Sequence, residues 1–197
     1  MVMISAVVLA AGRAERMGEQ KLFLPLNDKP VLQWVLEGAL ASNLHEVTCV
    51  VRDLKTMRQR ITLAHDRLHW LVNYGADRGQ SSSVIAGLWA IDPRSEGALF
   101  LSGDQPLVHK DLIDSLIEHF ENSSAWIVAP CFRGEARNPI LFRRDLFPEL
   151  LRLTGDRGGL LLIEKHKDRT AFVEWKEEIP FVDLNVREDY ERLKELA

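Results

Sequence analysis

The sequence predicts a single α/β domain built around a mostly parallel, buried sheet. Short apolar runs rich in β-branched residues alternate along the chain with longer segments of helical periodicity. The runs are apolar almost without interruption, as expected of parallel strands that are covered by helices on both faces. The length of 197 residues suits one domain, and no repeat, low-complexity tract or Gly/Ser-rich linker divides it. We therefore expect one three-layer domain over residues 1–197.

The first half of the chain shows the alternation most clearly. Residues 4–9 (ISAVVL), 46–51 (EVTCVV) and 69–73 (HWLVN) are expected strands, because most of their side chains are apolar or β-branched. Residues 31–41 and 54–64 carry apolar side chains at helical spacing. Residues 81–91 form the next expected helix, whose start is marked by consecutive serines that are able to cap it.

The second half continues with an expected strand at 98–102 (ALFLS), a helix at 110–121 and a strand at 126–130. After Cys131 the pattern loosens: Pro148 interrupts residues 141–153, and the segment 155–159 (GDRGG) precedes a helix that starts near Leu160. A strand at 170–175 and a helix at 189–196 complete the expected elements.

The composition excludes several classes of protein. Apolar residues make up 46% and charged residues 27%, which is ordinary for a globular domain, and 25 Lys plus Arg against 29 Asp plus Glu give a net charge of −4. No apolar run approaches the ~20 residues of a membrane span, and residues 1–5 lack the positive region of a secretory signal. Cys49 and Cys131 lie far apart in apolar surroundings and suit buried free thiols in a reducing compartment. We expect a cytoplasmic protein with no nucleic-acid and no membrane partner.

Two loops are expected at one edge of the sheet, because ligands of open parallel sheets bind outside the carboxyl ends of the strands. The first loop, residues 9–21, begins with small residues that let backbone N–H groups approach a phosphate closely. Its cations Arg13, Arg16 and Lys21 suit a polyphosphate and a pyrophosphate leaving group. The alternative is a surface turn with solvated cations. The loop contains neither the Gly-Lys-Ser/Thr of a Walker loop nor Gly-x-Gly-x-x-Gly.

The second loop, residues 102–106 (SGDQP), follows the strand at 98–102 and carries Asp104. A carboxylate opposite a phosphate-binding loop is suited to Mg²⁺, which takes one or two carboxylates together with substrate phosphates and water. The alternative is an aspartate that forms the turn or caps the following helix.

The motifs resemble those of nucleotidyltransferases of the molybdenum-cofactor type. Leu-Ala-Ala-Gly-x-x-x-Arg-Met-Gly-x-x-Lys at 9–21 looks like the family's signature, and Gly-Asp-Gln-Pro-Leu at 103–107 is similar to its metal-binding segment. Segments 73–88, 138–142, 155–158 and 182–190 resemble its later motifs, in the family's order along nearly the whole chain. The resemblance implies a Rossmann-like, glycosyltransferase-A-like fold and a reaction in which an acceptor phosphate attacks the α-phosphorus of a nucleoside triphosphate.

The resemblance assigns a role to each candidate residue. The expected catalytic residues are Arg16, Lys21 and Asp104. The expected nucleotide-binding residues are Leu9, Ala10, Ala11, Gly12, Arg13, Lys21, Asn73, Gly79, Ser81, Ser82 and Gly103. The expected acceptor-binding residues are Arg137, Asn138, Asp156 and Arg157, and Mg²⁺ is expected at Asp104 with Asp183 or Asn185.

Ala11 indicates the cytidylyl branch of the family, since the guanylyl branch tends to carry Leu-Ala-Gly-Gly where this chain has Leu-Ala-Ala-Gly. The implied reaction transfers CMP from CTP to molybdenum-molybdopterin and releases pyrophosphate, with a molybdenum hydroxylase as the possible recipient of the product. Two motifs depart from the family: Arg137 stands where a glycine is common, and Val186-Arg187 replaces Thr-Pro.

Other interpretations stay open. The nucleotide could be GTP, or the acceptor a sugar phosphate or an isoprenoid phosphate. A different class of protein, a non-catalytic carrier or insertion chaperone for a molybdenum hydroxylase, is also compatible, although it need not keep Arg16, Lys21 and Asp104. His65 and His69 have the spacing of a zinc pair but no evident third ligand.

Overall fold

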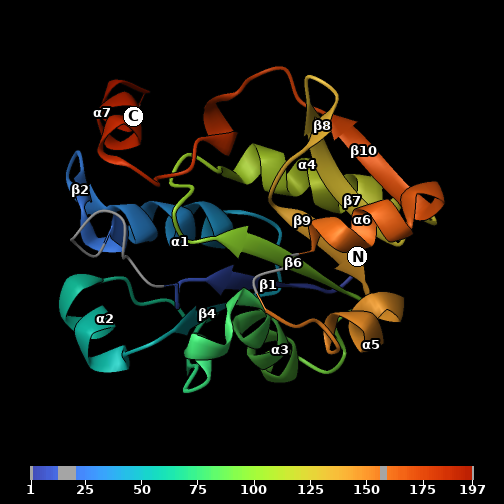
Figure 1. The fold of residues 1–197 in the computed structure, drawn as a ribbon, viewed down its shortest axis with the longest axis horizontal. Helices are drawn as coiled ribbons and strands as arrows, with labels where there is room; N and C mark the ends of the chain where they lie inside the picture. The colour runs from blue at the N-terminus through green and yellow to red at the C-terminus, as the bar shows by residue number, and fades with distance from the viewer. Residues whose placement is uncertain (1, 13–20, 156–158, 197) are drawn as a thin grey trace.

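The computed structural model describes residues 2–12, 21–155 and 159–196. The expectations for Arg13, Arg16, Asp156 and Arg157 fall outside these residues. Within them the main sheet has eight strands in the order β10-β7-β9-β6-β1-β4-β5, with β8 paired to β7 (Figure 1). The strands are β1 (Ile4–Leu9), β4 (Glu46–Val51), β5 (Leu68–Val72), β6 (Gly97–Ser102), β7 (Ile127–Phe132), β8 (Glu135–Ala136), β9 (Ile140–Arg143) and β10 (Thr170–Glu174).

The sheet is mostly parallel, as predicted. β1 lies between β4 and β6 and pairs in parallel with both, with Val7 opposite Thr48 and Phe100. β4 and β5 are parallel, and so are β7 and β10. β9 is inserted between β6 and β7 and runs antiparallel to both. The carboxyl ends of β1 and β6 therefore meet at one edge, where the two candidate loops begin.

Helices cover both faces of the sheet and make three layers (Figure 1). Alternate residues of β1, such as Ala6 and Val8, pack with α1 (Val31–Ala41) and α4 (Lys110–Glu121) on one face, where Met57 of α2 (Leu54–Arg60) joins the same apolar cluster. Val7 faces the opposite side, which is covered by α3 (Gln80–Ala90), α5 (Phe147–Leu150) and α6 (Leu160–Lys165). The two faces together hold the core.

The C-terminal segment returns across the molecule to the start of the chain. A third apolar cluster joins Leu26 of the β2–β3 hairpin (Pro25–Leu26 and Lys29–Pro30) to Leu184 and to Leu193 of α7 (Arg187–Leu196). The hydroxyl of Tyr190 donates to the carbonyl of Pro25. This packing places residues 182–185 beside the second candidate loop. The N–H of Leu184 donates a hydrogen bond of 3.0 Å to the carbonyl oxygen of Asp104 in that loop.

The expected elements are present, several with bounds shifted by one or two residues; the two-residue strands β2, β3 and β8 were not expected, and three further differences affect helices α2 and α3 and strand β9. The expected helix 54–64 ends at Arg60. The serines do not cap α3: Gly79 is its N-cap residue, with φ 96°, and the helix already begins at Gln80. The loosened segment after Cys131 contains strand β9, which the sequence pattern did not indicate. None of the helices in the described part of the chain is long and apolar enough to span a membrane.

Candidate functional site

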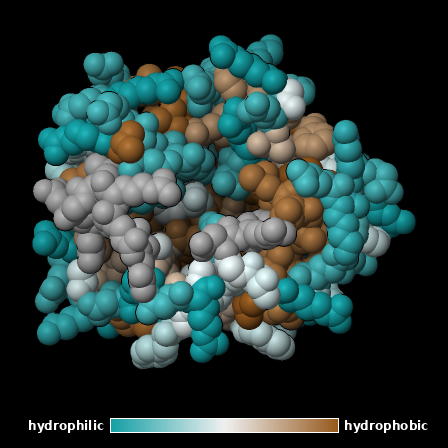
Figure 2. All heavy atoms as spheres, viewed as in Figure 1, coloured by the Kyte–Doolittle hydropathy of each residue, from teal (hydrophilic) through white to brown (hydrophobic). Residues whose placement is uncertain are grey.

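A cavity of about 960 Å³ opens at the carboxyl edge of the sheet. Figure 2 shows a hollow near the middle of this view, with hydrophilic side chains above it and apolar ones inside it and to its right. Its walls come from the first loop, from the segments after β4 and β5, and from the second loop. The predicted residues that line it are Leu9, Ala10, Ala11, Gly12, Lys21, Gly79 and Asp104.

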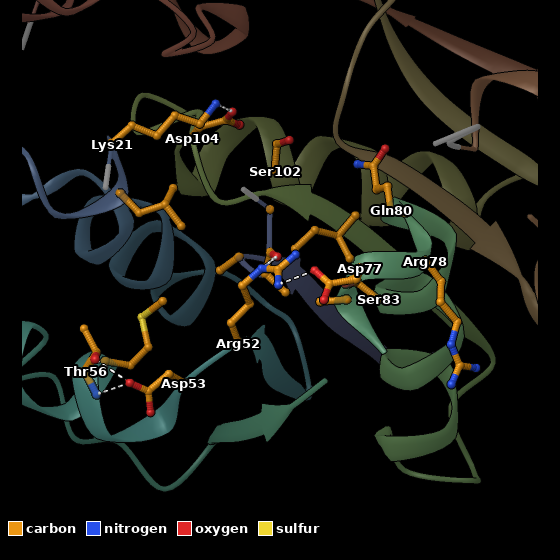
Figure 3. A pocket seen from close by; sticks show the side chains of 18 of the residues that line it. Lys21, Arg52, Asp53, Thr56, Asp77, Arg78, Gln80, Ser83, Ser102 and Asp104 are labelled. Atoms are coloured by element: carbon orange, nitrogen blue, oxygen red, sulfur yellow. Dashed lines mark hydrogen bonds and ion pairs between the residues drawn. The ribbon is translucent and has the colours of Figure 1, made fainter. Parts of the chain in front are cut away.

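Lys21 and Asp104 meet at one wall of this cavity (Figure 3). Lys21 Nζ lies 2.5 Å from Oδ2 of Asp104 and donates a further hydrogen bond of 3.2 Å to Oδ1 of Asn185. Three residues that the sequence analysis singled out are thus brought together from positions far apart in the chain. Oδ2 of Asp104 and Oδ1 of Asn185 both contact the same positive charge, the ammonium of Lys21.

The C-terminal tail holds Asn185 and Asp183 at this position. The Asp189 carboxylate accepts hydrogen bonds from the N–H groups of Asn185 (2.8 Å) and Val186 (2.9 Å), at the start of α7. Asp183 as a whole stays exposed. Partial loss of hydration around its carboxyl, with repulsion from Asp104, nevertheless raises the pKa of Asp183 to about 6, against the opposing effects of a Gln105 hydrogen bond and of Lys21.

These side chains fit a hard divalent cation. Carboxylate and amide oxygens are the ligands that Mg²⁺ and similar ions prefer, and one or two carboxylates suffice when substrate phosphates and water complete the shell. No group of three or more His, Cys, Asp or Glu side chains suited to a metal is found in the part of the chain that the structure describes.

Backbone hydrogen bonds tie the start of the first loop to the neighbouring strand and to the second loop. Ala10 N–H still donates to the carbonyl of Val50 over 2.9 Å, so it prolongs the β1–β4 ladder. Gly103 N–H donates to the carbonyl of Leu9 over 3.0 Å, and a Cβ on Gly103 would lie only 3.0 Å from that oxygen. Glycine at 103 thus permits the close approach of the two loops. Gly103 itself does not line the cavity, so its expected contact with nucleotide stays a prediction.

Asn73 and the serines form a buried hydrogen-bond network beside the cavity. Asn73 Nδ2 donates to Ser82 Oγ (2.9 Å) and Ser83 Oγ (3.0 Å), and its Oδ1 accepts from Gly75 N–H (2.9 Å). The Ser82 hydroxyl in turn donates to the Gly79 carbonyl. Ser83 lines the cavity, whereas Asn73, Ser81 and Ser82 do not. Asn73 thus orients the start of α3, and direct nucleotide contact by Asn73, Ser81 and Ser82 stays a prediction.

A second cavity of about 190 Å³ lies beside the first and shares Leu9, Gln80 and Ser102 with it. Asn138, an expected acceptor-binding residue, is one of its polar lining residues, and the rest of its wall is mainly apolar, including Phe100 and Phe142. Arg137 lines neither cavity; its Nη2 donates to Oε2 of Glu135 over 2.6 Å.

Several cavity residues were not singled out from the sequence. They are Arg52, Asp53, Thr56, Asp77 and Arg78, whereas Gln80, Ser83 and Ser102 lie in candidate segments but were given no role. Arg52 and Asp53 directly follow β4, so the rule that ligands bind at the carboxyl ends of strands could have found them had it been applied to every strand. Figure 3 shows Arg52 in the middle of the cavity with Asp77 facing it.

The fold and site are those of an enzyme that transfers a nucleotidyl group: an open α/β sheet, a small-residue loop with a lysine, and a carboxylate opposite. The chain belongs to the family of MobA-like NTP transferase domains, whose sequence profile matches residues 6–170. It is accordingly a nucleotidyltransferase, and the predicted fold class is confirmed.

Relatives of known name cover almost the whole chain. The purine catabolism protein PucB of Bacillus subtilis is 29% identical in an alignment 196 positions long, which covers 95% of this chain and 94% of that protein. A probable molybdenum cofactor guanylyltransferase of Methanosarcina mazei is 28% identical in an alignment 206 positions long, gaps included, which covers 96% of this chain and 89% of the relative.

Among solved structures, Rv0371c from Mycobacterium tuberculosis superposes with a TM-score of 0.86 at 28% identity, covering 98% of both chains. A manganese complex of Rv0371c superposes with a TM-score of 0.84 at 26% identity, covering 100% of both chains.

Proposed function

We propose that this nucleotidyltransferase transfers CMP from CTP to molybdenum-molybdopterin and releases pyrophosphate. The observation that carries the proposal is the contact of Lys21 with both Asp104 and Asn185, beside a cavity that Lys21, Asp104 and the Ala-Ala-Gly loop line. A relative named as a probable molybdenum cofactor guanylyltransferase supports a molybdopterin-type acceptor.

Asp104, Asp183 and Asn185 would hold Mg²⁺ in this proposal. The ion would supply positive charge next to the phosphates, where negative charge develops during transfer. The manganese complex of a structural neighbour supports a divalent cation of this kind. Both carboxylates and the amide come from segments that the Leu184–Asp104 hydrogen bond holds together.

The protein's own groups bind and orient the nucleotide. Phosphoryl-type transfer depends mainly on positioning and on neutralising charge. Backbone N–H groups at Ala11 and Gly12 would contact the triphosphate, and the Lys21 ammonium would exchange its carboxylate partner for pyrophosphate oxygens. Arg13 and Arg16 would add charge from the same loop. No general base is required, because the attacking phosphate is already ionised.

CTP is favoured over GTP by Ala11. Its side chain is 4% exposed, belongs to the buried cluster around Val7 and Val84, and also lines the cavity. A methyl group there leaves less room than the glycine of the guanylyl branch, which favours the smaller base. GTP is the second candidate, because relatives such as the Methanosarcina mazei protein are named as probable guanylyltransferases.

The acceptor would reach the first cavity from the second. Asn138 and Ser102 offer hydrogen bonds there, and the apolar wall suits a flat ring. Arg137, Asp156 and Arg157 stay predictions for the acceptor side. A molybdenum hydroxylase as recipient and a cytoplasmic setting also stay proposals; the two buried free thiols, Cys49 and Cys131, support a reducing compartment.

The test is pyrophosphate release by the full chain with Mg²⁺ and molybdenum-loaded molybdopterin, using CTP, GTP, ATP and UTP in turn. Release with CTP alone is the expected result, and Ala11→Gly should then admit GTP. Release with GTP alone would keep the reaction and overturn the base assignment.

Absence of release with every nucleotide, from folded protein and intact cofactor, would contradict this acceptor. Release on addition of a sugar phosphate or an isoprenoid phosphate would then identify a different transferase. Binding of molybdopterin without any nucleotide turnover would indicate a carrier instead.

A further inference from the structure

Arg52 joins the ends of three neighbouring strands through one guanidinium group (Figure 3). It directly follows β4. Its Nε donates to the carbonyl oxygen of Ala11, two residues beyond β1, over 2.8 Å. Its Nη1 donates to Oδ1 of Asp77, in the short 3-10 helix Ala76–Arg78 beyond β5, over 2.8 Å.

The contact with Ala11 begins where the backbone ladder ends. The carbonyl of Leu9 and the N–H of Ala10 are still bonded to backbone groups of Gly103 and Val50. At Ala11 the carbonyl oxygen accepts its hydrogen bond from the side chain of Arg52 instead of from a backbone N–H of a neighbouring strand. The orientation of the peptide between Ala11 and Gly12 therefore depends on a side chain.

This peptide controls where one phosphate-binding group points. A peptide unit is planar and trans, so the C=O of Ala11 and the N–H of Gly12 point in opposite directions. A guanidinium that fixes the carbonyl also fixes the N–H. Gly12 lines the cavity, and a Cβ placed on it meets nothing within 4 Å, so its backbone is open to a ligand.

We infer that Arg52 is a positioning residue for the triphosphate: it holds the Ala11–Gly12 peptide so that Gly12 N–H faces the nucleotide, and Asp77 holds the guanidinium in place. This inference rests on the proposed nucleotidyl transfer. It adds a residue outside the signature loop, on a different strand, to the machinery that binds the nucleotide.

The simpler interpretation is a surface ion pair. The side chains of Arg52 and Asp77 are 35% and 64% exposed, and ion pairs this exposed contribute little to stability. The two interpretations separate cleanly, because a surface pair would affect neither folding nor nucleotide binding. A positioning role affects binding of the triphosphate and leaves folding almost unchanged.

The experiment compares Arg52→Met and Arg52→Lys with the wild type. Calorimetric titration measures the binding of CTP and of CMP to each protein in the presence of Mg²⁺. If the wild type uses GTP, then GTP and GMP replace them. Arg60→Met, an exposed arginine on α2 outside the cavity, is the matched control. We expect Arg52→Met to weaken triphosphate binding about tenfold, with the monophosphate and the melting temperature almost unchanged. Arg52→Lys should recover little, because one ammonium cannot reproduce the guanidinium fork.

Asp77→Ala should act in the same direction, and the Arg52→Met/Asp77→Ala double variant should bind no more weakly than Arg52→Met alone. Equal losses for monophosphate and triphosphate, unchanged affinity, or a large fall in melting temperature would each overturn the inference. Wild-type protein that binds no nucleoside triphosphate would overturn the proposed function as well, whereas an unaffected Arg52→Met beside an active wild type overturns this inference alone.

Discussion

The ammonium of Lys21 lies 2.5 Å from Oδ2 of Asp104, although the two residues are 83 positions apart in the chain. Their side chains are 20% and 18% exposed, so the pair is partly screened from water. It connects the first loop to the second across one wall of the cavity. Because Nζ also contacts Oδ1 of Asn185, a divalent cation bound at these oxygen atoms would have to displace the Lys21 ammonium.

Asp104→Asn should abolish turnover and preserve the fold. The substitution keeps the size of the side chain and removes the charge that a divalent cation needs. Because a bound metal ion supplies several kcal/mol of charge stabilisation, we expect pyrophosphate release to fall by about a thousandfold or more. Asp111→Asn, at an exposed site in the first turn of α4, is the control and should retain the wild-type rate. A rate near wild type in Asp104→Asn would exclude this carboxylate as a metal ligand.

Lys21→Met should slow turnover and tighten metal binding in the absence of nucleotide. It removes the positive charge that we propose neutralises pyrophosphate. It also removes the ammonium group that occupies the Asp104 carboxylate in place of a metal ion. We expect the dissociation constant for Mn²⁺, followed by electron paramagnetic resonance of the free ion, to fall about tenfold. Lys55→Met, on the exposed side of α2, should change neither quantity. Weaker metal binding in Lys21→Met would show that the lysine supports the site rather than competing for it.

The fold was predictable where burial controls the sequence. β1, β4 and β6 are covered on both faces, so most of their residues are apolar, and their bounds were predicted to within a residue. β9 was missed, because a four-residue strand carries little periodicity and its insertion between β6 and β7 depends on tertiary pairing.

The site was predictable where a motif marks it. The two loops lie together because β1 and β6 are neighbours. Arg52 and Asp77 were missed, since each is a single polar residue without a motif, and only the order β1-β4-β5 brings them together. The serines were misinterpreted as caps because local sequence does not reveal the Asn73 amide that two of them bind.

Asn73→Ala should destabilise the protein through the network it supports. Asn73 is 9% exposed, and its amide holds two serine hydroxyls and one backbone N–H. Its removal leaves these groups without their partner, which costs about 2 kcal/mol in the free energy of unfolding. Urea unfolding measures the change, with Asn43→Ala at an exposed position as the control. Unchanged stability together with weaker nucleotide binding would instead assign Asn73 to direct contact with the ligand.

Two glycines should respond to alanine in opposite ways. At Gly87, in α3, an added Cβ would lie 2.3 Å from Cγ1 of the buried Val7 on β1, so helix and sheet would have to separate. Alanine favours a helix over glycine by about 1 kcal/mol, but overpacking of this severity costs about 3 kcal/mol. Gly87→Ala should therefore lower the free energy of unfolding.

At Gly12 the added Cβ has no neighbour within 4 Å, so Gly12→Ala should leave the free energy of unfolding unchanged or slightly raised. Its methyl group would stand in the cavity beside the first loop, where it would hinder close approach of a phosphate to the backbone. We expect nucleotide affinity to fall about tenfold in Gly12→Ala, while folded Gly87→Ala protein keeps more of its affinity. Urea unfolding and nucleotide titration of both variants measure the contrast. Loss of stability in Gly12→Ala, or its full retention of nucleotide affinity, would show that this loop is not the triphosphate site.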